Sequence, residues 1–204
     1  MTLEHEHDHD HDHDHEHEHG GHEHVAYPEA IARFRADKDD YFRSAHDSPI
    51  PHETRHDFGG LPYFPVDESL RFEGLTLEPY TGTEPTRFQI PTSDGKLQPA
   101  VRAGIYRFPI GDTTHALTGY TFESGASESV FVPFLDLTSG SETYGAGRYL
   151  DLFPEDDGTY ALDFNLAYHP SCVYDAERFS CPITPPENRL PLRIEAGERL
   201  APEG

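Results

Sequence analysis

The 204-residue sequence contains two lysines, Lys38 and Lys96, two cysteines and no tryptophan. Two cysteines are too few for the disulfide framework of a small secreted domain. The sequence has no run of about 18 apolar residues, so we predict no membrane-spanning helix. The N-terminus lacks the basic start and apolar middle of a signal peptide. We therefore expect a cytoplasmic protein that does not interact with membranes.

Basic residues are also scarce. The chain has 15 Lys and Arg against 38 Asp and Glu, which gives a formal net charge of −23. Such a surface repels nucleic acid phosphates and anionic lipids, so we expect neither as a partner. Acidic excess with little lysine resembles proteins of salt-loving archaea, where molar salt shortens the Debye length to about 3 Å. An acidic protein from a low-salt organism is the alternative.

Residues 1–24 hold nine carboxylates and ten histidines, with no Lys or Arg. This segment cannot form a core, so we expect it to be disordered without a ligand. Alternate side chains of an extended chain share one face, which would align the imidazoles in a row. Neutral imidazoles bind borderline metals such as Zn, Ni, Co or Cu. A solvated tail without a ligand is the alternative. The candidate metal ligands are His5, His7, His9, His11, His13, His15, His17, His19, His22 and His24.

Residues 25–204 are expected to form a single β-rich domain. Pro28 and the spacing of apolar residues predict an amphipathic helix over residues 28–44. From residue 70, short apolar runs alternate with turn residues, which is typical of an antiparallel barrel-like or sandwich sheet. The prolines of residues 165–191 predict a long loop that covers one end of the sheet, followed by a short strand near Leu192–Glu195. The other expected strands are residues 71–80, 86–91, 100–109, 114–123, 129–137, 148–153 and 159–164.

Candidate site residues concentrate between residues 134 and 198. Arg148 follows a loop with two glycines and could bind a carboxylate or phosphate through two parallel hydrogen bonds. An internal ion pair of Arg148 with Asp163 or Glu198 is the alternative. Asp163 and Asn165 share one face of the expected strand, where they could line a pocket mouth or cap a turn.

Cys172 and Cys181 are separated by nine positions. A nucleophilic cysteine would need a base such as His115 or His169, neither of which has a diagnostic spacing. A zinc site would need two further ligands. The third interpretation is a structural pair, either bonded or merely adjacent.

Several segments together carry a resemblance to a known family. They are 57–61, 63–65, 143–149, 163–165, Tyr168, Pro170, Cys172, Cys181, Pro182, Asn188 and 196–198. In these segments the chain resembles the family catalogued as domain of unknown function 1684, found in bacteria and archaea. The similarity covers about residues 27–200 and does not include the histidine-rich tail. Because the family has no assigned activity, the resemblance implies no particular reaction.

These patterns favour a binding protein that sequesters or delivers metal through its tail and holds a small anionic ligand in its β-domain. The alternative is a small hydrolase or oxidoreductase that uses a pocket around Arg148, Asp163, Tyr168 and Cys172. The sequence leaves the oligomeric state open. The candidate ligand-binding residues are Tyr144, Arg148, Asp163, Asn165, Tyr168, Cys172, Cys181, Asn188 and Glu198.

Overall fold

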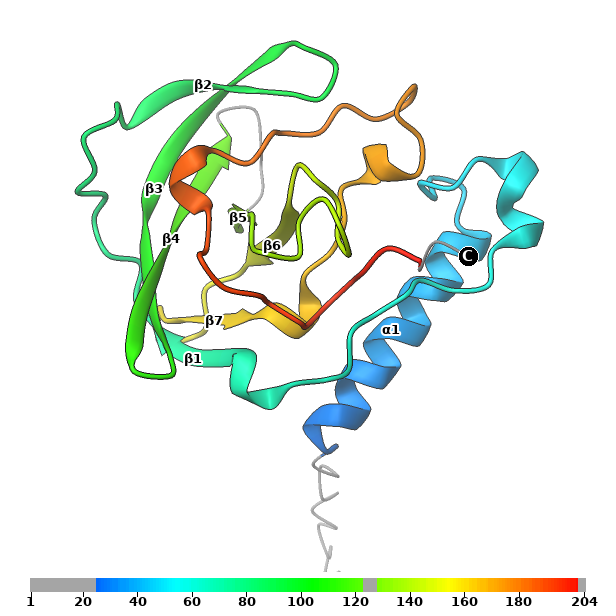
Figure 1. The fold of residues 1–204 in the computed structure, drawn as a ribbon, viewed down its shortest axis with the longest axis horizontal. Helices are drawn as coiled ribbons and strands as arrows, with labels where there is room; N and C mark the ends of the chain where they lie inside the picture. The colour runs from blue at the N-terminus through cyan, green and yellow to red at the C-terminus, as the bar shows by residue number, and fades with distance from the viewer. Residues whose placement is uncertain (1–24, 123–127, 202–204) are drawn as a thin grey trace, which may run out of the picture.

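The computed structural model describes residues 25–122 and 128–201 (Figure 1). The ten histidines predicted to bind metal lie outside the described residues. Within the described ranges, no helix is both long enough and apolar enough to cross a membrane.

Five antiparallel strands form the larger sheet in the order β2-β3-β4-β5-β6. Its centre is the long hairpin of β3 (Leu97–Ile110) and β4 (Thr113–Phe122), which runs along the left of Figure 1 with β5 and β6 on its inner side. The hairpin turns at Gly111, whose φ of 58° lies in the left-handed region that glycine adopts without strain. The other strands are β2 (Arg87–Pro91), β5 (Val130–Phe134) and β6 (Arg148–Leu152).

A second sheet consists of β1 (Arg71–Leu75) and β7 (Tyr160–Asp163), paired antiparallel. The expectation of a mainly β, antiparallel domain is confirmed. The strands of the described residues form two separate sheets, however, and no closed barrel. At the free edge of β6, the main chain of Tyr149 exchanges two hydrogen bonds with Tyr168 of the covering loop. The loop thus occupies the position that a closing strand would need.

The hydrophobic core lies between the larger sheet and the segments that cross it. Alternating residues of β3, such as Tyr106 and Phe108, point into the core, because successive side chains of a strand face opposite sides. Leu117 of β4 joins the same cluster. The C-terminal segment adds Ile194 and Ala196 to the same cluster. The fully or almost fully buried members include Tyr106, Phe108, Leu117, Val132, Phe134, Leu150, Leu162 and Phe164.

The N-terminal helix α1 spans Tyr27–Ser44, within one residue of the expected range, and Pro28 lies in its first turn. The helix lies outside the larger sheet (Figure 1). Its buried residues are Ile31 and Phe42. Phe42 packs edge-on against Tyr174, with ring centroids 5.1 Å apart. This contact joins the helix to the covering loop.

The prediction of a final strand near Leu192–Glu195 is wrong, because this segment forms no strand. Side chains, rather than a neighbouring strand, satisfy its main chain. The Ile194 amide donates to Asp136 Oδ2 at 2.7 Å, and the Ile194 carbonyl accepts from Arg148 Nη2 at 2.7 Å. The segment is extended and buried without joining a sheet.

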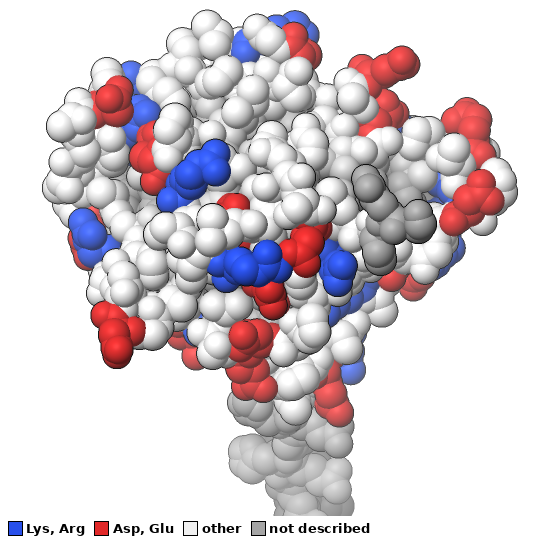
Figure 2. Space-filling model, viewed as in Figure 1, with Lys and Arg blue, Asp and Glu red and all other residues white. Residues whose placement is uncertain are grey.

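Charged side chains of both signs lie next to one another on the face shown in Figure 2. Arg193, for example, contacts both Glu142 and Glu195. Close pairing of this kind offsets part of the repulsion that a net negative charge creates.

Candidate functional site

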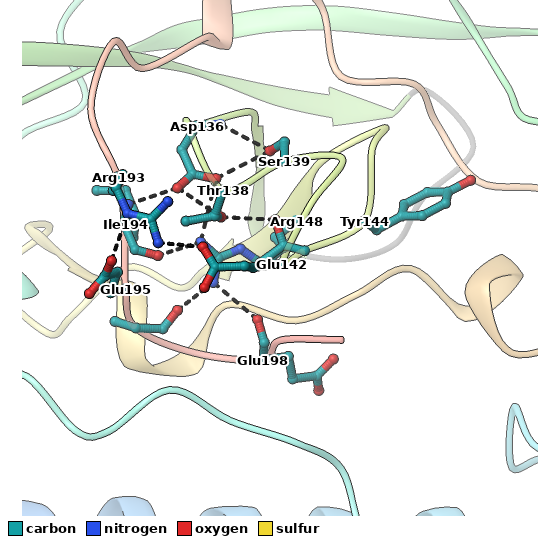
Figure 3. A network of polar contacts seen from close by, with 12 residues as sticks. Asp136, Thr138, Ser139, Glu142, Tyr144, Arg148, Arg193, Ile194, Glu195 and Glu198 are labelled. Atoms are coloured by element: carbon teal, nitrogen blue, oxygen red, sulfur yellow. Dashed lines mark hydrogen bonds and ion pairs between the residues drawn. The ribbon is translucent and has the colours of Figure 1, made fainter. Parts of the chain in front are cut away.

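Arg148 begins β6 and its side chain is completely buried. The residue before Arg148 must be glycine for two reasons. Gly147 has a φ of 106°, and a Cβ atom at this position would lie 2.5 Å from the Phe134 carbonyl oxygen. The guanidinium donates to the Ala196 carbonyl, to the Glu198 carbonyl at 3.1 Å and to the Ile194 carbonyl. Arg148 is therefore bonded inside the domain, as Figure 3 shows.

The ionic partner of Arg148 is Asp136, whose Oδ1 lies 3.6 Å from Arg148 Nη2 with both side chains fully buried. Burial lowers the pKa of Arg148 to about 10, an effect that the nearby Asp136 carboxylate opposes. Asp163, one of the two partners expected from the sequence, does not pair with Arg148 in this structure. Glu198, the other, contributes its main-chain carbonyl.

Asp136 is a site residue that the sequence patterns do not predict. It accepts hydrogen bonds from the Thr138 hydroxyl at 2.8 Å and from the Ser139 hydroxyl at 3.2 Å. An Asp followed two and three residues later by Thr and Ser is typical of a turn, and a turn is all that this sequence pattern predicts. Nothing in that pattern indicates that the second carboxylate oxygen would bind the C-terminal segment.

The Glu198 side chain connects α1 with the covering loop. Its Oε1 lies 2.6 Å from Lys38 Nζ of α1. Its Oε2 accepts from the His169 amide at 2.7 Å and from the Tyr174 hydroxyl at 3.3 Å. The Lys38 ammonium also lies over the Tyr168 ring, 4.8 Å from its centroid. Glu198 is thus a buried, multiply bonded carboxylate that attaches the helix to the core.

His169 lies in this network as a neutral imidazole. Its Nε2 accepts from the Tyr144 amide at 3.3 Å. Burial, followed by the charges of Arg148 and Lys38, lowers the pKa of His169 to about 3. The neutral form therefore persists although Glu198 Oε2 lies 3.8 Å from His169 Nδ1.

Asp163 and Asn165 cap the turn that follows β7. Asp163 Oδ1 accepts from the Asn165 amide at 2.9 Å, and Asp163 Oδ2 accepts from the Tyr27 hydroxyl at 2.7 Å. The Asn165 side chain bonds both the amide and the carbonyl of Asp67 at 2.8 Å. Of the two roles predicted for Asn165, lining a pocket mouth or capping a turn, the second fits better, because its polar side-chain atoms all have partners within the domain.

Asn188 is completely buried and bridges two strands. Its Oδ1 accepts from the Thr118 amide, and its Nδ2 donates to the carbonyls of Thr118 and Pro133 at 2.8 and 2.7 Å. Strands β4 and β5 pair at one position, Tyr120 with Phe131. The amide of Asn188 replaces ladder hydrogen bonds where these two strands separate.

Cys172 and Cys181 are buried free thiols that lie side by side. The Cys172 amide donates to Cys181 Sγ at 3.3 Å. Burial raises the pKa of Cys181 to about 12, and the side-chain contact with the Cys172 thiol acts in the same direction, while the hydrogen bond from the Cys172 amide opposes it. Tyr144 contacts Cys172 through its hydroxyl, which contributes to the raised pKa of Tyr144. The thiolate is the reactive form of cysteine, and this environment disfavours the thiolate. The interpretation as a structural pair therefore fits Cys172 and Cys181 best.

Two of the candidate residues, Asp163 and Tyr168, do share a groove. It has a volume of about 390 Å³ and lies between α1, β6 and the segment around β7. The Tyr168 hydroxyl donates to Asp151 Oδ2 at 2.5 Å. Burial and this carboxylate raise the pKa of Tyr168 strongly. The remaining lining residues are Phe34, Leu150, Leu152, Phe153, Glu155, Ala161 and Leu166.

A second hollow of about 370 Å³ continues from the first across the sheet, because Asp151 and Phe153 line both. Phe34 and Phe153 are 42% and 61% exposed, and both line the first groove, so they add apolar surface to one concave region. Arg148 and Cys172 line neither hollow. The structure therefore does not gather Arg148, Asp163, Tyr168 and Cys172 into one pocket.

The described residues contain no group of three His, Cys, Asp or Glu side chains placed to hold a metal ion. Any metal site of the histidine-rich segment would lie in residues 1–24, outside these ranges.

Comparison with known proteins places the chain in a family. A family model described as "Protein of unknown function (DUF1684)" matches residues 56–199, and the chain belongs to this family. The solution NMR structure of an uncharacterized protein from gene locus rrnAC0354 of Haloarcula marismortui is similar, with 36% sequence identity and a TM-score of 0.63. The match covers 86% of this chain and 95% of that chain. A search of curated proteins found no match.

Proposed function

We propose that the β-rich domain binds a small molecule in the groove between α1, β6 and β7. The single observation that carries this proposal is the combination of exposed Phe34 and Phe153 with the Tyr168–Asp151 hydrogen bond in one concave surface. Binding sites of small molecules are concave and mostly apolar, with a few polar groups that fix orientation. The internal bonds of Arg148 favour this location over the glycine loop.

The charge of the groove indicates the ligand class. Its ionisable lining residues other than Tyr168 are the carboxylates Asp151, Glu155 and Asp163. We propose a ligand with an apolar or aromatic body and a cationic amine, rather than the small anion expected from Arg148. The amine would lie near Asp151, which is exposed.

A titration followed by amide NMR shifts tests this proposal, with phenethylamine as the cationic aromatic probe and phenylacetate as its anionic counterpart. We expect saturable shifts confined to Phe34 and its neighbours, residues 150–155 and residues 161–168 with the amine, and weaker shifts with the acid. Asp151→Asn should weaken amine binding, whereas Asp112→Asn in the exposed β3–β4 turn should not. Equal binding of both probes, or equal loss in both variants, would contradict the proposal.

We also propose that residues 5–24 bind Zn, Ni, Co or Cu and that the protein sequesters or delivers these metals in the cytoplasm. The proposal is supported by the ten histidines of the segment. Binding should weaken between about pH 7 and pH 5, because protonated imidazole cannot bind metal. Calorimetry with Ni should show several equivalents on the full chain, and replacement of the ten histidines by Asn should abolish them. Unchanged stoichiometry in that variant would contradict a role for the segment.

A further inference from the structure

A depression beside the C-terminal end of α1 is lined by basic side chains, in a domain whose net charge is negative. Its volume is about 760 Å³, and no carboxylate lines it. Residues 25–204 carry 29 acidic and 15 basic side chains, so their formal net charge is −14. A purely basic concave surface is therefore contrary to the composition of the domain. Besides Ser44, the lining residues are Arg43, Arg55, Arg178, His46, His52 and His56.

Main-chain carbonyls hold two of the three guanidinium groups in place. Arg55 donates from Nε to the Ile50 carbonyl at 2.9 Å and from Nη1 to the Ala45 carbonyl at 2.7 Å. Arg178 donates from Nη2 to the Ser48 carbonyl. Carbonyl oxygens orient a guanidinium without neutralising it. Arg55 has no ion-pair partner among the described residues, so its positive charge is uncompensated.

The nearest carboxylates contact the basic residues from outside the depression. Arg43 Nη1 lies 2.6 Å from Asp40 Oδ1, and Arg178 Nε lies 3.5 Å from Asp175 Oδ2. His56 Nε2 lies 3.2 Å from the exposed carboxylate of Asp57. The side chains of Arg43 and Asp40 are 48% and 77% exposed. Exposed pairs of this kind are weak and exchange partners easily. They leave the guanidinium groups able to bind a more highly charged anion.

We propose that this depression binds a small molecule that carries phosphate groups. The planar fork of arginine matches phosphate oxygens and binds two of them at once. Three arginines supply more charge than one carboxylate ligand would need, whereas a phosphate or diphosphate group carries two or more negative charges. The strongly acidic remainder of the domain would repel an extended polyanion, so nucleic acid does not fit the same surface. The site is distinct from the carboxylate-lined groove of the proposed function.

Pyrophosphate is the probe for this site, titrated into the full chain and followed by amide NMR shifts and calorimetry. We expect saturable binding, with the shifts concentrated in residues 43–57 and around Arg178. Arg43→Gln should weaken binding about tenfold, the effect expected when one charge-assisted hydrogen bond is lost. Arg43 is suited to the test because its side chain is exposed and, unlike those of Arg55 and Arg178, is not held by a main-chain carbonyl.

Arg107→Gln is the matched control. Arg107 is 46% exposed, pairs with Glu78 at 2.9 Å and lies in β3, outside the depression. Both substitutions change the net charge of the chain equally. Absence of saturable binding, or equal weakening by the two variants, would overturn the proposal. Tighter binding of citrate than of pyrophosphate would overturn the phosphate assignment, and equally tight binding of duplex DNA would overturn the restriction to small molecules.

Discussion

Lys38 Nζ lies 2.6 Å from Glu198 Oε1, and this contact joins α1 to the last described segment of the chain. The side chains are 18% and 2% exposed, so the carboxylate is the more buried partner. The second lysine, Lys96, lies at the same distance, 2.6 Å, from Asp94 Oδ2 but is 81% exposed. The two lysines of the protein thus form ion pairs of equal length in opposite environments.

Lys38→Met should lower the free energy of unfolding by about 3 kcal/mol, because it leaves the buried Glu198 carboxylate without its charge partner. Lys96→Met is the control and should leave the denaturation midpoint unchanged. Chemical denaturation of the two variants measures the difference. Combining Lys38→Met with Glu198→Gln should recover part of the loss, since no unpaired charge then remains buried. Equal behaviour of the two lysine variants would refute a buried pair.

Arg148→Ala should cost about 3–5 kcal/mol of stability, because it strands the buried Asp136 carboxylate and three main-chain carbonyls. Arg148→Lys should recover little, since an ammonium group cannot reproduce the planar fork. Urea denaturation checks both values. A loss below about 1 kcal/mol, which is typical of an exposed pair, would show that Arg148 is not bonded internally in solution.

His169 should make stability depend on pH in the acidic range. Its pKa in the folded protein is about 3, below the ordinary value of 6.5, so between these pH values the unfolded chain binds a proton that the folded protein does not. Stability should therefore fall as the pH decreases from 6.5 to 3, by up to about 1.4 kcal/mol for each pH unit from this group.

The variant His169→Gln tests this linkage. Its amide oxygen can accept the hydrogen bond from the Tyr144 amide, while the side chain does not titrate. The difference in unfolding free energy between the protein and the variant, measured at several pH values, should shrink or reverse towards pH 4. A difference in unfolding free energy that is constant from pH 7 to pH 4 would exclude His169 as the source of the pH dependence.

Withdrawal of salt should destabilise the domain, because the repulsion that corresponds to a net charge of −14 is screened only at high ionic strength. Thermal melts in molar potassium chloride and at low salt provide the measurement. We expect a clearly lower melting temperature at low salt. Matching melts in both conditions would show that local pairs, such as Arg193 with Glu142 and Glu195, already compensate the charge.

Local patterns in the sequence predicted most of the secondary structure correctly. All seven expected strands from residue 71 to residue 164 exist, with ends that differ by up to five residues. The helix over Tyr27–Ser44 also matches its pattern. These elements follow from local periodicity and from turn residues such as Gly111, which act within a few positions along the chain. Short motifs that include Tyr144, Arg148 and Asn188 likewise indicate the family.

The partners of the buried polar groups follow from the packing of the folded chain and not from local sequence patterns. Arg148 pairs with Asp136 rather than with Asp163, and the segment near Ile194 bonds these side chains instead of forming a strand. The basic depression depends on Arg178 approaching the Ser48 carbonyl, 130 positions away. No local pattern encodes such contacts, because they arise when segments distant in sequence pack around a common core. Spacing can show which residues share a strand face, but only packing determines which charges meet.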